Sequence, residues 1–176
     1  MRWAHLIAAG GKVLDVAAGS GRHTLWLAER GHPVTAIDRD ADRVAALAGR
    51  AEAIVADIEG GAWPLVGRMF DAVVVTNYLW RPLLPVLTGS LAPGGVLMYE
   101  TFAAGNETVG RPRRAEFLLA PGELLTAAAG LRIVAYEDGF LADPDRFVQR
   151  LVAVRERVGD PPERHPLTAG AADAAR

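Results

Sequence analysis

The chain alternates between short, continuous apolar runs and amphipathic runs along most of its length. Continuous apolar runs are typical of parallel strands covered on both faces, and the clearest is Phe-Asp-Ala-Val-Val-Val-Thr at 70–76. Between them, apolar residues at helical spacing, glycine stop signals and an N-capping Asp40 indicate helices. The pattern predicts strands at 12–16, 34–38, 53–56, 70–76 and 96–100, and helices at 22–30, 41–48, 83–91 and 121–129.

Two β-rich runs, 131–141 and 146–155, follow this alternation and flank the turn-forming sequence Ala-Asp-Pro-Asp. They predict an antiparallel hairpin that closes the sheet. Repeated strand–helix units followed by a hairpin indicate an α/β sandwich with a mostly parallel sheet. We expect Pro93-Gly94-Gly95 to form the turn before the fifth strand.

Composition fits one globular domain: the chain has 176 residues, of which 51% are hydrophobic and 23% charged. We expect this domain at 1–158 and a flexible tail at 159–176. The net charge of −2 gives no overall attraction to nucleic acid or membranes, and no apolar run approaches the ~18 residues of a membrane span. Absence of cysteine excludes disulfides and thiolate zinc sites. We therefore expect a cytoplasmic protein with no membrane partner and no metal, of unknown oligomeric state.

A glycine turn between the first strand and the first helix is the clearest candidate for chemistry. Gly19 and Gly21 permit a tight bend and close approach of the main chain to a ligand. Asp38 ends the next strand, where a carboxylate can accept hydrogen bonds from both hydroxyls of a ribose. This combination predicts an adenosine-containing cofactor at the carboxyl edge of the sheet.

The spacing Asp-x-Ala-x-Gly-x-Gly at 15–21, the strand-end acids Asp38 and Asp57, and Leu-Ala-Pro-Gly-Gly at 91–95 resemble the class I S-adenosylmethionine-dependent methyltransferases. Gly19 to His23 with the helix that follows is similar to the small TehB-like bacterial members. The resemblance implies a Rossmann-like three-layer α/β sandwich, with a mostly parallel seven-stranded sheet and an antiparallel C-terminal hairpin. It implies S-adenosyl-L-methionine as cofactor and S-adenosyl-L-homocysteine as product.

The resemblance also assigns cofactor-binding residues. Asp15 orients the turn or reaches the amino group of the methionine moiety, and Asp57 meets the adenine amine with Ile58 against the ring. Ala17 replaces a glycine found in many members, and an alanine is tolerable there if its φ is negative and its methyl group does not meet the cofactor. The residues expected to bind the cofactor are Asp15, Ala17, Gly19, Gly21, His23, Asp38, Arg39, Asp57, Ile58 and Asn77.

Candidate catalytic residues follow the fourth and fifth strands. Asn77 and Tyr78 stand where the resemblance places the reacting methyl group, although the prolines of nucleic-acid amino methyltransferases are missing. Glu100 ends the fifth strand and is placed to act as a general base. Packing of Tyr78 over the cofactor, or a loop-anchoring role for Glu100, are the structural alternatives.

The connection at 101–120 has no clear period, and connections of this length are usually functional. Arg111, Arg113 and Arg114 lie in it. They can clamp an anionic substrate or be solvated and paired with Glu107 and Glu116.

These features predict a methyltransferase with a small-molecule acceptor. An RNA (tRNA) or protein acceptor, with nucleic acid not excluded, and a non-catalytic cofactor-binding module are alternatives. An NAD-linked oxidoreductase fits less well, because bulky His23 precedes Thr24 where the dinucleotide fingerprint needs a small residue.

Overall fold

The computed structural model describes residues 1–159 and 163–168, which form a seven-stranded sheet in the order β3-β2-β1-β4-β5-β7-β6. Only β7 runs antiparallel to its neighbours, which gives the predicted mostly parallel sheet with a C-terminal hairpin. The strands are β1 (Val13–Val16), β2 (Val34–Asp38), β3 (Glu52–Val55), β4 (Phe70–Thr76), β5 (Leu91–Phe102), β6 (Arg132–Leu141) and β7 (Arg146–Val154).

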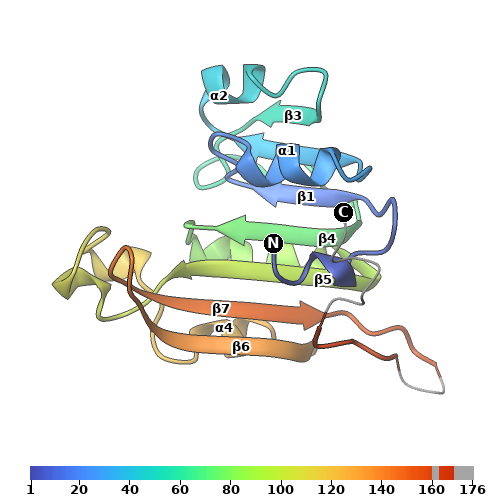
Figure 1. Cartoon of the computed structure of the whole chain (residues 1–176). Coiled ribbons are helices and arrows are strands. Elements are labelled where there is room, and N and C mark those ends of the chain that lie inside the picture. Colours follow the sequence, from blue (N-terminus) through green and yellow to red (C-terminus); the bar gives the residue numbers. More distant parts are fainter. Residues whose placement is uncertain (160–162, 169–176) are drawn as a thin grey trace.

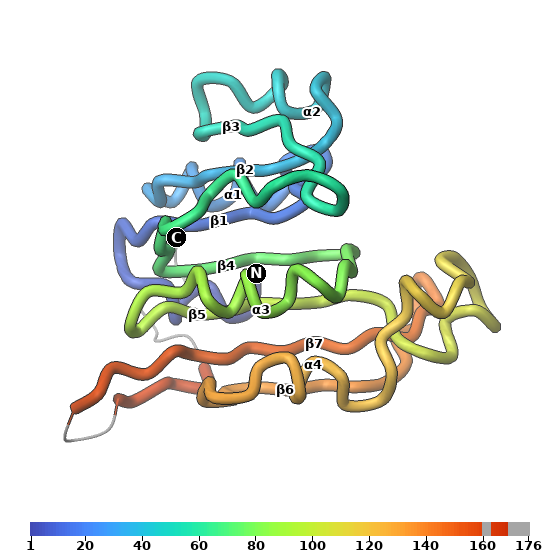
Figure 2. Tube along the Cα trace, turned by 180° about the vertical axis from the view of Figure 1, so that it is seen from behind, coloured from blue at the N-terminus to red at the C-terminus, as the bar shows by residue number. Residues whose placement is uncertain are grey.

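Helices cover both faces of the sheet and create three layers (Figures 1 and 2). One face carries α1, the other carries α3 and α4, and α2 packs beside β2 and β3. The α-helices are α1 (Arg22–Ala28), α2 (Ala41–Ala45), α3 (Leu84–Gly89) and α4 (Glu123–Ala127), and short 3₁₀ turns occupy Ala4–Leu6, Arg81–Leu83, Asn106–Thr108 and Ala115–Phe117.

The central strands are buried because both of their faces contribute to a core. Val73 and Val75 of β4 point toward α3 and α4, whereas Val74 joins the core beneath α1. Burial on both faces explains the continuous apolar sequence of β4. The sheet thus fixes the carboxyl ends of β1, β2 and β4 side by side along one edge, where a ligand site is expected.

Several predicted boundaries were wrong. The helices are shorter than expected at one or both ends, and β3 begins and ends one residue earlier than predicted. Pro93-Gly94-Gly95 lies inside β5 rather than in a turn before it. The main chains of Gly94 and Gly95 exchange hydrogen bonds with Arg155 after β7, and these bonds extend the strand. A register irregularity opposite Phe70 and Ala72 absorbs the proline.

The connection after β5 is more ordered than its sequence pattern indicates. Asn106 is buried, donates from Nδ2 to the carbonyl of Pro112 and accepts the N–H of Phe147. Arg81 donates to the carbonyls of Glu116 and Leu118, which anchors the end of the connection to the molecule. These long-range bonds have no local sequence period, so the pattern did not reveal them.

Of the expected tail 159–176, residues 160–162 and 169–176 lie outside the described residues. Its flexibility therefore stays a prediction. Within the described part, Glu163 pairs with Arg157 at 2.6 Å. None of the helices in the described ranges combines the length and apolar character that crossing a bilayer requires.

Candidate functional site

A crevice of about 320 Å³ lies at the carboxyl edge of the sheet, where β1, β2, β3 and β4 end. Loops that follow these strands converge there because parallel strands end at the same edge. The crevice is lined by Ala17, Gly19, Asp38, Arg39, Arg43, Ala56, Asp57, Ile58, Glu59, Asn77 and Tyr78.

The turn after β1 is left-handed at three positions. Gly19 has φ 56° and Gly21 has φ 72°, values that glycine adopts without the steric cost that other residues meet. Ala17 has φ 52°, so the negative φ under which an alanine would be tolerable there is not adopted. An alanine in this conformation costs roughly 1 kcal/mol. Strain of this kind at the edge of a ligand crevice is typical of a functional loop.

Asp38 connects the end of β2 to the glycine turn. One of its carboxylate oxygens accepts the N–H of Gly19 at 2.7 Å, and the other accepts the N–H of Asp40 at 2.9 Å. Asp40, not Asp38, caps α2 by accepting the N–H groups of Asp42 and Arg43. Because each carboxylate oxygen accepts more than one hydrogen bond, Asp38 keeps capacity for a diol in the crevice.

Asp15 lies in β1 before the turn and does not line the crevice. Its carboxylate is 1% exposed and accepts a 2.6 Å hydrogen bond from the hydroxyl of Thr24 in α1. Burial raises the pKa of Asp15 to about 6, although the Thr24 hydrogen bond opposes this shift. The bond joins β1 to the first turn of α1 and therefore fixes the loop between them.

Asp57 follows β3 and shapes its own turn. Its Oδ1 accepts the N–H groups of Glu59 and Gly60, and these bonds hold the pKa of the carboxyl below its usual range. Both Asp57 and Ile58 line the crevice. Asp57 thus shapes the loop after β3 and also lines the crevice.

Asn77 and Tyr78 follow β4 and line the crevice from the other side. Asn77 has φ 54°, and its N–H donates to the carbonyl of Glu100 at 2.9 Å. The hydroxyl of Tyr99 donates to the carbonyl of Tyr78 at 2.9 Å, which fixes the main chain of this segment. Burial raises the pKa of the Tyr78 phenol above its usual range, so the hydroxyl stays protonated at neutral pH.

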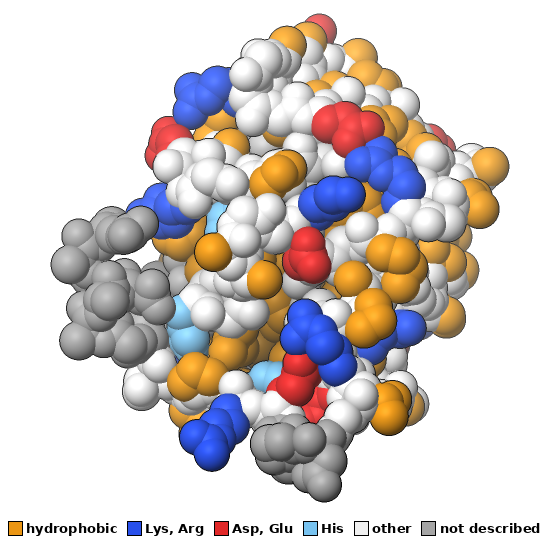
Figure 3. Space-filling view, turned by 90° about the vertical axis from the view of Figure 1, so that its right-hand side faces the viewer, with side chains coloured by type: hydrophobic (Ala, Val, Ile, Leu, Met, Phe, Trp, Pro, Cys, Tyr) orange, Lys and Arg blue, Asp and Glu red, His pale blue; other side chains and the backbone are white. Residues whose placement is uncertain are grey.

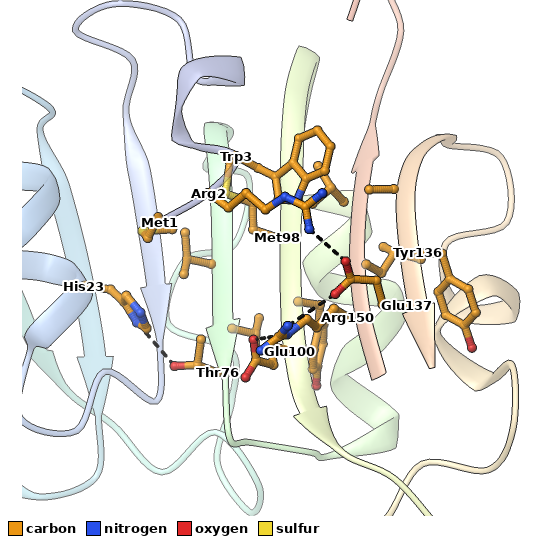
Figure 4. A pocket seen from close by; sticks show the side chains of 16 residues that line it. Met1, Arg2, Trp3, His23, Thr76, Met98, Glu100, Tyr136, Glu137 and Arg150 are labelled. Atoms are coloured by element: carbon orange, nitrogen blue, oxygen red, sulfur yellow. Dashed lines mark hydrogen bonds and ion pairs between the residues drawn. The ribbon is translucent and has the colours of Figure 1, made fainter. Parts of the chain in front are cut away.

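His23 and Glu100 line a second hollow, the sheet-face cavity, of about 310 Å³ (Figure 4). His23 Nδ1 lies 3.3 Å from the hydroxyl of Thr76, the residue before Asn77. Glu100 pairs with Arg150 at 2.7 Å and lies 3.8 Å from Arg146. Glu100 is thus held by arginine side chains rather than by the backbone amides expected for a loop anchor.

Two of the three arginines considered in the connection after β5 contact nearby groups. Arg114 pairs with Glu116, as one alternative foresaw, and Arg113 donates to the carbonyl of Gly110. For these two arginines the structure agrees with the solvated and paired alternative.

The structure brings together seven of the ten residues expected to bind the cofactor, while Asp15, Gly21 and His23 lie outside the crevice lining. Arg43, Ala56 and Glu59 line the crevice and were not predicted. Arg43 comes from α2, and its guanidinium lies beside the Gly19 turn. Ala56 and Glu59 carried a sequence signal, since both stand within two residues of Asp57, whereas Arg43 carried none. Within residues 1–159 and 163–168, no cluster of three or more His, Asp or Glu side chains could hold a metal ion.

Comparison with known proteins agrees with this geometry. A family model described as a methyltransferase domain matches residues 13–95, a little under half of the chain, and this range contains the whole crevice lining. The predicted resemblance to the S-adenosylmethionine-dependent methyltransferases is confirmed. A search of curated protein sequences finds no match.

Solved structures share the fold at low sequence identity. TehB from Haemophilus influenzae is 22% identical with a TM-score of 0.71, over 87% of this chain and 60% of that one. A TehB-like SAM-dependent methyltransferase from Corynebacterium glutamicum is 22% identical with a TM-score of 0.59, over 85% of each chain. The [4+2]-cyclase SpnF is 20% identical with a TM-score of 0.64, over 88% of this chain and 77% of that one. Since one of these neighbours is a cyclase, the fold by itself does not specify methyl transfer.

Proposed function

We propose that this chain, whose residues 13–95 carry a methyltransferase domain, is an S-adenosylmethionine-dependent methyltransferase that acts on a small molecule in the cytoplasm. The observation that carries the proposal is the convergence of Asp38 and the Gly19 turn on one crevice, joined by a 2.7 Å hydrogen bond. A carboxylate beside a turn with glycine at positions 19 and 21 suits a ligand with a sugar diol and a compact amino-acid end.

The residues that line the crevice suit each part of the cofactor. Asp38 accepts the ribose hydroxyls, while Asp57 accepts the adenine amine and Ile58 packs against the ring. Asn77 and the turn at Ala17 and Gly19 hold the methionine end. Asp15 contributes indirectly through Thr24, because that hydrogen bond fixes the turn.

S-adenosylmethionine supplies an activated methyl group on a sulfonium, which leaves as a neutral thioether. The protein therefore has to align the acceptor with the methyl group and exclude water. Asn77 and Tyr78 stand beside the reacting position and carry out this alignment, with the main chain of Tyr78 fixed by Tyr99. Glu100 is less suited to remove a proton, because Arg150 and Arg146 engage its carboxylate.

Calorimetric titration with S-adenosylhomocysteine and with NAD tests the cofactor. We expect S-adenosylhomocysteine to bind and NAD to give no heat. Binding of NAD without binding of S-adenosylhomocysteine would indicate an NAD-linked oxidoreductase instead of a methyltransferase.

Transfer of a labelled methyl group from S-adenosylmethionine to pooled small metabolites, and separately to tRNA and protein, tests catalysis. We expect label in the small-molecule pool. Label only in tRNA or protein would overturn the choice of acceptor, and cofactor binding without transfer to any pool would indicate a non-catalytic module.

A further inference from the structure

The sheet-face cavity is built from two parallel rows of side chains that cross β4, β5, β7 and β6. Strand pairing places Val74 beside Met98, Met98 beside Val152, and Val152 beside Ala135. All four residues line the cavity and form its apolar floor, the apolar row. Because side chains alternate between the faces of a strand, the row two residues further along lies on the same face.

That second row is polar and lies toward the carboxyl ends of β4 and β5. The same registers place Thr76 beside Glu100, Glu100 beside Arg150, and Arg150 beside Glu137. We call these four residues the polar row. The row holds two carboxylates and one guanidinium, and Arg150 pairs with Glu100 at 2.7 Å and with Glu137 at 3.2 Å.

Two further residues close the ends of the polar row (Figure 4). His23 of α1 contacts Thr76 at one end, and Arg2 pairs with Glu137 at 2.8 Å at the other. Trp3 and Met1 from the N-terminal segment complete the wall. The cavity thus has an apolar floor and one polar margin. At this margin the two carboxylates, Glu100 and Glu137, are balanced by two guanidinium groups, Arg150 and Arg2.

The polar margin adjoins the cofactor crevice. Thr76 lines the sheet-face cavity, and the next residue, Asn77, lines the crevice. A molecule whose apolar part covers the apolar row therefore directs its polar end to the position where the methyl donor is proposed to bind.

We propose that the sheet-face cavity is the acceptor site, and that it takes a small, uncharged, largely apolar molecule with one protic nucleophile at its end. This inference rests on the proposed methyltransferase function and adds the substrate class. The cavity volume of about 310 Å³ lies at the lower end of the range for small-molecule sites.

His23 is the group placed to take the acceptor proton. When its own proton is on Nδ1 and donated to Thr76, its Nε2 is the proton acceptor. Burial, Arg22 and the N-terminal ammonium lower the pKa of His23, while Glu100 opposes them, so the imidazole is neutral at pH 7. In the balanced step the nucleophile forms a bond to the methyl carbon, the sulfonium sulfur keeps the electron pair of the broken bond, and the proton moves to His23.

The three methionines provide a direct test by NMR with [¹³C-methyl]methionine. With S-adenosylhomocysteine present, 2-naphthol should shift the methyl resonance of Met98 but not that of Met69, which is 43% exposed and lines a different hollow. The charged analogue 6-hydroxy-2-naphthoate should bind at least about tenfold more weakly, because the guanidinium groups of Arg150 and Arg2 are already paired with Glu100 and Glu137.

Histidine resonances in the same samples test the orientation of the bound molecule, with its polar end toward His23. The Cε1–H signal of His23, assigned with His23→Gln, should shift on addition of 2-naphthol. The signal of His32, which contacts the carbonyl of Gly11 away from the cavity, should not. An unchanged His23 signal with a shifted Met98 signal would overturn the proposed orientation and the role of His23.

Ala135→Phe should fill the apolar row and abolish the Met98 shift while S-adenosylhomocysteine still binds. Ile133→Phe, on the same strand but outside the cavity lining, is the matched control. The wild-type spectra decide the matter if Ala135→Phe does not fold. Binding of S-adenosylhomocysteine with a silent Met98 would overturn the acceptor site alone, whereas failure of S-adenosylhomocysteine to bind would overturn the proposed function as well.

Discussion

At the residue scale, Asp38 connects the glycine turn to the crevice. Its carboxylate fastens the glycine turn through Gly19 and also lines the crevice. The same carboxylate is therefore expected to contribute to turn geometry and to cofactor affinity. An asparagine accepts hydrogen bonds through only one of its two terminal atoms, so Asp38→Asn removes the charge and one of the two turn bonds.

Asp38→Asn should weaken S-adenosylhomocysteine binding by about 10- to 100-fold, because hydrogen bonds to a charged group contribute about 1.5–3 kcal/mol. Calorimetry measures the change. Asp42→Asn, an exposed acid of α2 outside the crevice, should leave the affinity unchanged. Equal loss in both variants would mean that net charge, not the diol contact, is responsible.

Asp15 predicts a pH dependence of stability. Its pKa is raised from 3.8 to about 6 in the folded protein, so the folded state binds this proton more tightly than the unfolded state does. Ionisation of this carboxyl therefore lowers the free energy of unfolding as pH rises from 4 to 6. Above pH 6 the free energy of unfolding is reduced by the full amount.

The variant Asp15→Asn lacks this titration. The free energy of unfolding of Asp15→Asn relative to wild type should increase between pH 4 and pH 6 and then remain constant. Urea unfolding at several pH values measures it. A difference that is independent of pH would show that Asp15 has the same pKa in both states.

At the element scale, the glycine turn is fixed by its packing against the segment after α2. A Cβ atom on Gly21 would lie 2.2 Å from Cδ2 of the buried Leu47, so only glycine fits there. The turn conformation and the position of α2 are consequently coupled, and the crevice depends on both.

Gly21→Ala should lower the free energy of unfolding by about 2–4 kcal/mol, from overpacking of about 1–3 kcal/mol and left-handed strain of about 1 kcal/mol. Gly49→Ala is the matched control, because Gly49 has φ 76° but its Cβ would meet nothing within 4 Å. The free energy of unfolding of Gly49→Ala should fall by only about 1 kcal/mol. Equal losses in urea unfolding would exclude the Leu47 contact as the cause.

At the scale of the whole molecule, the lining of the crevice comes from the loops after β1, β2, β3 and β4 and from α2. Ligand binding should therefore stabilise the domain as a unit rather than one loop. The opposite edge of the sheet carries acidic and basic side chains interspersed on the visible surface (Figure 3).

S-adenosylhomocysteine at 100 times its dissociation constant should add about 2.7 kcal/mol to the free energy of unfolding, because it binds the folded state only. Thermal unfolding measures the rise in Tm, and NAD at the same concentration should produce none. A Tm that does not respond to S-adenosylhomocysteine would contradict the cofactor assignment.

The sequence by itself determined the order of strands and helices along the chain and the positions of the glycine turn and Asp38. Strand burial on both faces of β4 and the stop signals around the helices are local properties, and so are the glycine turn and the strand-end acid Asp38. Parallel strands bring such residues to one edge without further information, which explains why most of the crevice lining could be predicted.

Only the tertiary structure decided the side-chain partners and the second hollow. The pairing of Glu100 with Arg150 and the contact of His23 with Thr76 join residues 50 and 53 positions apart in the chain. The rows of the sheet-face cavity depend on strand register across the antiparallel hairpin. Register and long-range contacts arise from packing of the whole domain, so no local period in the sequence encodes them.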